Sequence, residues 1–304
     1  MIRNQKIRYG KKFKILRKII KYFLSLLYPI IIKIYPLPKV LSIEETIKKI
    51  IDERLSLARF GDGEFLYIID KLSLPFQDYN YKLANSLKTL LKIDDTRILV
   101  GLPIGYYSLK ELNRESQLTW RSQIVWIYPR LRKYLNLNKI YANASISRLY
   151  IEYEDIKLSR NYIEMIKGIW QGKDIIIVEG EKSRLGVGND LFENAKTVKR
   201  ILAPAVNAYE KFTALIDRVS TEARDKLILL ALGPTAKPLA YELTKLGFQA
   251  VDIGNLDIEY EWYLRGAKEK IKIPGKYTSE APGGRTVEEI EDESYSQQII
   301  ARII

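Results

Sequence analysis

From residue 43 onward, short apolar runs alternate with stretches in which apolar residues recur at helical spacing. Short apolar runs bounded by turn residues are typical of strands that are buried on both faces of a sheet. Because helical stretches separate most of the runs, the pattern predicts an α/β fold with an open, largely parallel sheet covered by helices on both faces. The runs are SLARFG (56–61), RILVGLP (97–103), KIYANAS (139–145), DIIIVEG (174–180), RILAPA (200–205), KLILLALG (226–233) and QAVDIG (249–254).

The domain opens with a predicted helix, SIEETIKKIIDER (42–54). Ser42 is followed three residues later by Glu45, which is the signature of a capping box. No internal repeat is apparent, and no Pro/Gly/Ser-rich linker divides residues 43–270, so we expect one domain over residues 41–275. The remaining residues, 276–304, are turn-rich and then acidic, and they predict a surface extension that adds little to the core.

Composition excludes several classes of protein and of site. The chain has 304 residues, 47% of them hydrophobic, which is incompatible with a disordered protein. It contains no Cys and no His, so disulfides, thiolate zinc sites and Ser-His-Asp triads are impossible. Any metal must bind to oxygen ligands, which favours Mg²⁺ or Mn²⁺, with Ca²⁺ as a further option.

The positive charge is concentrated in the first 40 residues. The formal net charge is +13, and residues 1–40 hold eleven Lys and Arg but no Asp or Glu, which leaves +2 for the rest. A nucleic-acid groove across the folded body is therefore not expected, and we predict no nucleic-acid partner, although a basic arm alone could still bind nucleic acid.

The same arm, residues 1–40, suggests a membrane surface. Its uncharged run over residues 22–32 contains Pro29 and is much shorter than the about 20 apolar residues that span a bilayer. A cationic first half and a Leu/Ile/Tyr-rich second half suit a segment that lies in the interface of an anionic leaflet. This interpretation places the protein in the cytoplasm, peripheral on the inner face of the cell membrane. A secretory signal would need a small-residue cleavage site, which is missing, but a helix packed on the protein's own body stays open.

Ligands of such sheets bind at the carboxyl ends of the strands, so the loops there are the candidate sites. In EGEKSRLGVGNDLF (179–192), Gly186 and Gly188 follow a strand, and Asn189 or Asp190 can cap an expected helix over residues 191–200. Free N–H groups at that helix start, together with Arg184, suit a phosphate. The spacing fits neither the P-loop nor the dinucleotide fingerprint, and an ordinary turn is the alternative.

Two later loops carry further candidates. In LGPTAKPLAYEL (232–243), Gly233 permits close approach of the backbone and Thr235 offers a hydroxyl, although a tight turn would explain the same residues. DIGNLDIEYEW (252–262) holds four acids; Asp257 and Glu261 share a helical face, whereas Glu259 points elsewhere. A carboxylate in this stretch could serve as a base for a hydroxyl nucleophile or as a second metal contact.

The stretch RFGDGEF (59–65) places Asp62 and Glu64 one residue apart. If the backbone is turned rather than helical, which Gly61 and Gly63 permit, both carboxylates can approach one point and share a divalent cation. The alternative is a solvated turn in which Asp62 caps a helix.

Together, seven segments resemble the GT-D type glycosyltransferases, a bacterial family first described as a domain of unknown function whose members carry a DxE motif. The resemblance covers roughly residues 43–275, and its segments follow the family's order. They are SLARFGDGEF, VGLP, YANASISRLY, IIIVEGEKSRLGVGNDLF, RILAPAVNAY, LLALGPTAKPLAYEL and AVDIGNLDIEYEW.

The resemblance implies a Rossmann-like sheet and an enzyme that passes a hexose from a UDP-sugar, UDP-glucose or UDP-galactose above all, to an acceptor hydroxyl. The acceptor would be a glycan or a lipid-linked or protein-linked saccharide, in glycoprotein, capsule or exopolysaccharide assembly. Asp62 and Glu64 would act through Mn²⁺ or Mg²⁺ on the donor diphosphate. The expected donor contacts are Arg59, Gly61, Glu179, Ser183, Arg184, Gly186, Gly188, Asn189, Asp190, Gly233 and Thr235.

The same resemblance suggests Asn255, Asp257 and Glu259 as catalytic residues, the two acids by orienting the acceptor hydroxyl. The position of Asn255 is often histidine in the family, so any acid–base role of an imidazole there does not carry over, although Asn can still form hydrogen bonds. Two other functions stay open: another metal-dependent enzyme acting on nucleotides or phosphates, and a membrane-associated nucleotide-binding module without catalysis.

Overall fold

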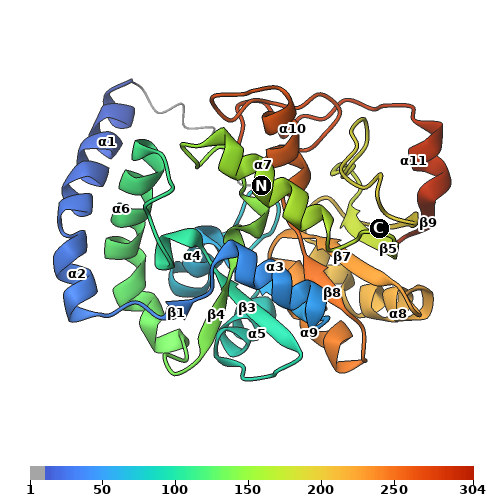
Figure 1. The fold of residues 1–304 in the computed structure, drawn as a ribbon, viewed down its shortest axis with the longest axis horizontal. Helices are drawn as coiled ribbons and strands as arrows, with labels where there is room; N and C mark the ends of the chain where they lie inside the picture. Colours follow the sequence, from blue (N-terminus) through green and yellow to red (C-terminus); the bar gives the residue numbers. More distant parts are fainter. Residues whose placement is uncertain (1–10) are drawn as a thin grey trace, which may run out of the picture.

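The computed structural model describes residues 11–304, with side chains from residue 15 onward, so the first ten residues of the predicted arm lie outside the description. Its centre is a nine-stranded parallel sheet in the order β1-β4-β3-β2-β8-β7-β5-β6-β9 (Figure 1). The strands are β1 Lys39–Val40, β2 Ser56–Arg59, β3 Ile98–Leu102, β4 Ile140–Asn143, β5 Asp174–Gly180, β6 Thr197–Ala203, β7 Leu227–Ala231, β8 Ala250–Asp252 and β9 Ile299–Arg302. The predicted α/β fold class is confirmed, and every predicted strand is present.

Helices cover both faces of the sheet, as the continuous apolar runs predict. In β5, Ile176 and Val178 pack with α4, α5, α6, α8 and α9, whereas Ile175 and Ile177 pack with α3, α7 and α10 on the opposite face. The α-helices are α1 Lys11–Leu26, α2 Tyr28–Ile34, α3 Ile43–Asp52, α4 Asp62–Asp70, α5 Tyr81–Lys92, α6 Arg114–Leu131, α7 Ile156–Lys167, α8 Phe212–Glu222, α9 Ala236–Lys245, α10 Leu256–Leu264 and α11 Glu293–Gln298.

The predicted capping box is present at α3. The Ser42 hydroxyl accepts from the backbone N–H of Glu45, and the Glu45 carboxylate accepts from the N–H of Ser42. Local side chains thus satisfy two of the N–H groups that a helix start leaves without backbone partners.

Two predictions about the second half of the chain are wrong. Residues 191–196 form turns rather than a helix, and β6 then begins at Thr197, where the β-branched Thr197 and Val198 suit a strand. The C-terminal segment is more than a surface extension, because its last residues form β9 and pair with β6 at the sheet edge. Thr278 in the same segment is fully buried.

The arm forms α1 and α2, which lie end to end along α6 at one edge of the molecule (Figure 1). The break between them falls at Leu27, two residues before Pro29, which lacks the N–H that a continuous helix would use. None of the helices over residues 11–304 combines the length and the apolar character needed to cross a bilayer. One face of α1 and α2 packs on α6, as expected from the interpretation in which the arm packs on the protein's own body.

Candidate functional site

A large cavity, which we call the main cavity, lies at the carboxyl ends of the strands, where the strand order reverses. In the sheet, β3 follows β2 along the chain and lies on one side of it, while β8 lies on the other side of β2, next to β7. β2 and β8 are therefore neighbours at a switch point of the kind that binds ligands in α/β sheets. The cavity measures about 870 Å³. Loops after most strands, the first half of α6 and the segment 268–280 line it.

Arg59 and Asp252, the last residues of β2 and β8, pair across this switch point. Arg59 Nη2 lies 2.9 Å from Asp252 Oδ1, and the guanidinium also donates to the Ala144 carbonyl and to Ser147. Burial opposes ionisation of Asp252, but the charges of Arg59 and Lys237 outweigh it and lower the pKa of this carboxyl. Gly254 leaves the room for this pair, because a Cβ there would lie 1.9 Å from Arg59 Nη2.

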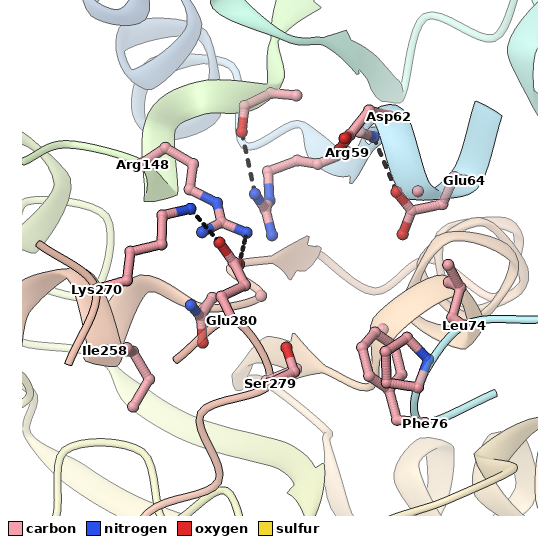
Figure 2. A pocket seen from close by; sticks show the side chains of 18 of the residues that line it. Arg59, Asp62, Glu64, Leu74, Phe76, Arg148, Ile258, Lys270, Ser279 and Glu280 are labelled. Atoms are coloured by element: carbon pink, nitrogen blue, oxygen red, sulfur yellow. Dashed lines mark hydrogen bonds and ion pairs between the residues drawn. The ribbon is translucent and has the colours of Figure 1, made fainter. Parts of the chain in front are cut away.

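Asp62 and Glu64 both line the cavity, but on helical backbone. They are the first and third residues of α4, and Gly61 is its N-cap, so the predicted non-helical turn is wrong. Glu64 Oε2 accepts from the N–H of Gly61 at 2.9 Å, and Asp62 Oδ2 accepts from Gln123 Nε2 at 2.9 Å. Figure 2 shows the two carboxylates near Arg59 at the same side of the cavity. The first turn of a helix stabilises negative charge, so this backbone suits both acids.

Asp62 differs from Glu64 in how its charge is compensated. Its side chain is exposed to the cavity, yet protein surrounds it on most sides. This confinement, and next the charge of Glu64, raise the pKa of the Asp62 carboxyl. Arg148 acts in the opposite direction from a distance. A cation that entered the cavity would relieve this repulsion.

Lys237, which the sequence analysis did not single out, completes this side of the cavity. Its ammonium lies 2.9 Å from Glu64 Oε1 and 3.2 Å from Asp252 Oδ2, and it donates to the Gly233 carbonyl at 2.9 Å. The side chain is 5% exposed, so these contacts hold a buried charge. Its place as the second residue of α9, just after the GPT turn that follows β7, was the available signal.

The opposite side carries a second charged group that was also missed. Arg148 follows β4, and it contacts Glu280, which Lys270 also contacts (Figure 2). Burial alone would raise the pKa of Glu280, but the two cations outweigh it and lower the pKa to about 2. Glu280 thus stays ionised and fixes the segment 268–280 against the cavity wall.

The glycine-rich loop over residues 179–190 mostly turns away from the cavity; of the five candidates Ser183, Arg184, Gly186, Gly188 and Asn189, only Ser183 lines it. The Arg184 guanidinium is buried and donates to the carbonyls of Gly275 and Glu288 and to the Glu289 carboxylate. The residues directly after Gly188 form turns and then β6, so the predicted phosphate site at a helix start is wrong. The Arg184 guanidinium is also not available to a phosphate, because groups of the C-terminal segment already accept its hydrogen bonds.

The remaining candidates of that loop serve the interior or a second, smaller cavity. The Glu179 carboxylate is fully buried, lies 2.6 Å from Arg200 Nη1 and accepts from the Leu185 N–H at 2.7 Å. Asp190 contacts Lys167 and Tyr260. Gly186, Gly188, Asn189 and Asp190 line a cavity of about 500 Å³ beside α11 instead of the main one. The structure therefore does not bring these residues to Asp62.

The GPT turn contributes one of its two candidates. Gly233 lines the cavity with φ of +53°, and a Cβ there would lie 2.3 Å from the Phe76 ring. Thr235 is fully buried, and its hydroxyl lies 3.4 Å from Gln77 Oε1. Gly233 therefore lets the Phe76 ring pack against the cavity wall, whereas Thr235 is part of the interior.

The three candidates around α10 have different environments. Asn255 lines the cavity, and its buried Nδ2 has no hydrogen-bond partner within the described part of the chain. Asp257 also lines it, but its carboxylate already accepts from Lys276 Nζ, the Gly186 N–H and Asn189 Nδ2. Asn255 is thus the residue here with a free donor.

Glu259, by contrast, lies outside the cavity. Its Oε2 accepts from the N–H groups of Tyr150 and Ile151, both at 3.2 Å. Burial raises the pKa of Glu259 to about 7, although Arg148 acts in the opposite direction. Glu259 holds the loop that carries Arg148, and it does not face the cavity.

Asp62 and Glu64 fit a hard divalent cation only in part. Over residues 11–304, no group of three or more acidic side chains could hold a metal ion without other ligands. The pair supplies two carboxylates, one of them with an uncompensated charge. Oxygen ligands from a bound diphosphate and from water would complete a shell for Mg²⁺ or Mn²⁺, which commonly bind in this way.

A family model described as the glycosyltransferase GT-D fold matches residues 57–281. Two curated relatives are similar in sequence. A probable glycosyl transferase named Gly, from Streptococcus gordonii, is 38% identical over 267 residues, which cover 87% of this chain and 39% of that protein. Glycosyltransferase GlyD of Streptococcus pneumoniae is 37% identical over 267 residues, which cover 88% of this chain and 33% of that protein. The match thus spans well under half the length of either relative.

Solved structures agree with this fold. One, described as the highly conserved domain of unknown function 1792 with a distinct glycosyltransferase fold, has a TM-score of 0.81 and 38% identity over 94% of this chain and 99% of that one. Another, described as a new glycosyltransferase from Streptococcus sanguinis, has a TM-score of 0.82 and 36% identity over 88% of this chain and all of that one. The segment that the family model matches, residues 57–281, contains both Asp62 and Glu64.

Proposed function

Since the chain belongs to the glycosyltransferase GT-D fold family, we propose that it transfers a hexose from UDP-glucose or UDP-galactose to a hydroxyl of a saccharide acceptor. One observation carries the proposal: Asp62 and Glu64 open α4 inside the main cavity, beside the switch point of the sheet. Donor nucleotides of α/β enzymes bind at such a point.

The charges around the cavity support a metal-assisted donor site. Seven acidic and five basic side chains line it, so a diphosphate entering without a cation would meet net repulsion. Mn²⁺ or Mg²⁺ held by Asp62 and Glu64 would supply charge neutralisation for the departing UDP. Lys237 fixes Glu64 from the other side, so that the carboxylate does not have to be ordered when the donor binds.

The apolar side of the cavity suits the nucleoside. Leu74, Pro75 and Phe76 line it. Figure 2 shows Leu74 and Phe76 on the same side of the cavity as Glu64. We assign the uracil and ribose to this side, with the Phe76 ring as the flat surface on which the base lies.

For the acceptor, we assign Asn255 as the residue that orients its hydroxyl groups. Asn255 lines the cavity and its Nδ2 has no hydrogen-bond partner among the described residues, whereas Asp257 is held by Lys276 and serves to fix the start of α10. Glycans and lipid-linked or protein-linked saccharides are the acceptors that we propose, on the cytoplasmic side of the cell membrane.

A panel of UDP-sugars, each incubated with Mn²⁺ and with or without saccharide acceptors, tests the proposal through UDP release and product mass. We expect acceptor-dependent release with one donor, and at least an about hundredfold loss of turnover in Asp62→Asn and in Glu64→Gln. Asp70→Asn is the matched control, because Asp70 ends the same helix and pairs with Arg130 at the surface. Sugar-independent hydrolysis would favour a phosphate-handling enzyme, and binding without turnover would favour a binding module.

A further inference from the structure

The arm has one face on the body and another that the body leaves uncovered. On the inner face, the Tyr128 hydroxyl donates to the Pro36 carbonyl at 2.6 Å, and the guanidinium of Arg121 lies 6.0 Å from the Tyr28 ring centre. Lys21 lies 3.9 Å from Glu115 at the start of α6. These contacts place α1 and α2 parallel to α6, with a defined outer face.

The outer face is apolar and continuous. Ten large apolar side chains of residues 15–34 are exposed, each by 46–62%. The thirteen other exposed large apolar side chains of the described residues are scattered. Six of the ten follow the helical spacing i, i+4, i+7 and form a single stripe, which consists of Leu16, Ile20, Phe23, Leu27, Ile30 and Ile34. The ten are Ile15, Leu16, Ile19, Ile20, Tyr22, Phe23, Leu26, Leu27, Ile30 and Ile34. Patches of this kind on a folded protein mark a surface that binds a partner.

The positive charge of the arm indicates which partner its apolar face binds. The first 40 residues contain eleven Lys and Arg and no acid, and Arg17 and Lys18 are exposed on α1 beside the apolar stripe. A second copy of the chain docked on the same face would bring two cationic arms together, which Coulomb repulsion disfavours. An anionic lipid surface satisfies both the apolar stripe and the cations.

We propose that the outer face of α1 and α2 docks on an anionic lipid bilayer, with both helices lying in the plane of the interface. The inference goes beyond sugar transfer and does not depend on it. In this arrangement the apolar stripe enters the boundary between headgroups and acyl chains, and the basic side chains contact lipid phosphates. Neither helix crosses the bilayer, in keeping with their length.

The docking surface also connects to the cavity through α6. One side of α6 contacts the arm through Arg121 and Tyr128, and another lines the cavity with Thr119 and Gln123. Gln123 donates to Asp62, so the helix that supports the arm also holds a cavity carboxylate. A bilayer bound to the arm therefore lies one helix away from the cavity wall.

Vesicle co-sedimentation of the full chain tests the proposal. We expect binding to vesicles of equimolar phosphatidylglycerol and phosphatidylcholine, little binding to pure phosphatidylcholine, and weaker binding as salt increases. The variant Leu16→Ser/Phe23→Ser/Ile30→Ser should bind about a hundredfold more weakly, since three stripe residues no longer enter the bilayer. Its matched control is Leu72→Ser/Leu137→Ser/Leu246→Ser, which removes exposed leucines elsewhere and should bind as wild type does.

Further measurements separate the stripe from the charges and from self-association. Arg17→Gln/Lys18→Gln should weaken binding about fivefold per charge removed, and only with the anionic vesicles. Circular dichroism and Asp62-dependent UDP release of the stripe variant, expected to match wild type, show that its body stays folded. Equal binding by the stripe variant and its control would overturn the proposal. The proposal would also be overturned if the wild type did not bind the vesicles but formed a dimer, seen by light scattering, that the stripe variant does not form.

Discussion

The ammonium of Lys237 lies 2.9 Å from the Glu64 carboxylate and 3.2 Å from that of Asp252, so one buried cation joins the helix after β2 to the end of β8. Without this cation, Asp252 would keep Arg59 as its charged partner, whereas Glu64 would lose its salt bridge. Lys237 thus couples the candidate metal-binding pair to the switch point of the sheet.

We predict that Lys237→Met lowers both stability and turnover. Removing one partner of a buried ion pair typically costs about 3–5 kcal/mol of unfolding free energy, because the remaining charge is left uncompensated. We expect turnover to fall at least about tenfold as Glu64 loses its orientation. Urea denaturation and UDP release measure the two effects. Lys245→Met, at the exposed end of the same helix, is the control, and equal values for both variants would contradict the assigned role.

Gly254→Ala should displace the Arg59 guanidinium, because the new Cβ would lie 1.9 Å from Nη2. The residue also has a φ of +45°, so any side chain adds backbone strain of about 1 kcal/mol. Gly266→Ala isolates that strain, since Gly266 has φ of +58° and open space around its Cβ position. We expect Gly254→Ala to lose more unfolding free energy than Gly266→Ala and to lose UDP release, whereas Gly266→Ala keeps its activity.

A double-mutant cycle identifies Arg59 as the cause. In an Arg59→Ala background the clash is absent, so the cost of Gly254→Ala should shrink toward that of Gly266→Ala. An unchanged cost would mean that the strain at residue 254, rather than the guanidinium, explains the effect.

The strands were predictable because each depends on its own local pattern of apolar residues. DIIIVEG is buried on both faces and appears as β5 with the predicted bounds. The two edge strands were not predicted: β1 has only two residues, and β9 follows an acidic segment that reads as surface. Both form because a neighbouring strand offers free backbone groups, and a sequence pattern does not contain that information.

The candidate site was predictable where one short motif supplies it. The spacing of Asp62 and Glu64 made them candidates, and both line the main cavity, while their role stays a prediction. The helix that follows was foreseen only in the alternative in which Asp62 caps it. Lys237, Arg148 and Glu280 were missed, because each gains its role only when distant loops meet. The opposite error occurred at Arg184: glycines around it resemble a phosphate loop, but a segment far along the chain provides its partners.

We predict that Glu259→Gln changes the pH dependence of stability without abolishing catalysis. The pKa of Glu259 rises from 4.5 to about 7 on folding, mainly through burial, with Glu152 adding to the effect and Arg148 and Lys270 opposing it. A carboxyl with a raised folded pKa favours the native state while it is protonated, so its contribution is lost as the pH rises from about 4.5 through 7. The loss is on the order of 3 kcal/mol.

The glutamine of the variant cannot ionise, so the variant does not lose this stability. The difference in unfolding free energy, variant minus wild type, should therefore rise by about 3 kcal/mol between pH 5 and pH 8. Urea denaturation across that range, with UDP release at each pH, measures the difference. A constant offset between the two proteins would contradict the burial argument. A folded variant with an about hundredfold loss of turnover would restore Glu259 as a catalytic residue.

Arg184→Met should loosen the C-terminal segment rather than weaken donor binding. Its guanidinium donates to the Gly275 carbonyl at 2.7 Å, the Glu288 carbonyl at 2.8 Å and the Glu289 carboxylate at 2.9 Å, and it lies outside the main cavity. The buried Gly275 carbonyl loses its donor, which costs about 1–3 kcal/mol where no replacement forms, and the Glu288 carbonyl, which is partly buried, loses the same donor. We expect faster amide hydrogen exchange over residues 275–298 and a donor KM within about twofold of wild type. Arg285→Met removes an exposed arginine from the same segment and should change neither quantity. A large rise in donor KM with unchanged exchange would instead assign Arg184 to the diphosphate, as its sequence context first suggested.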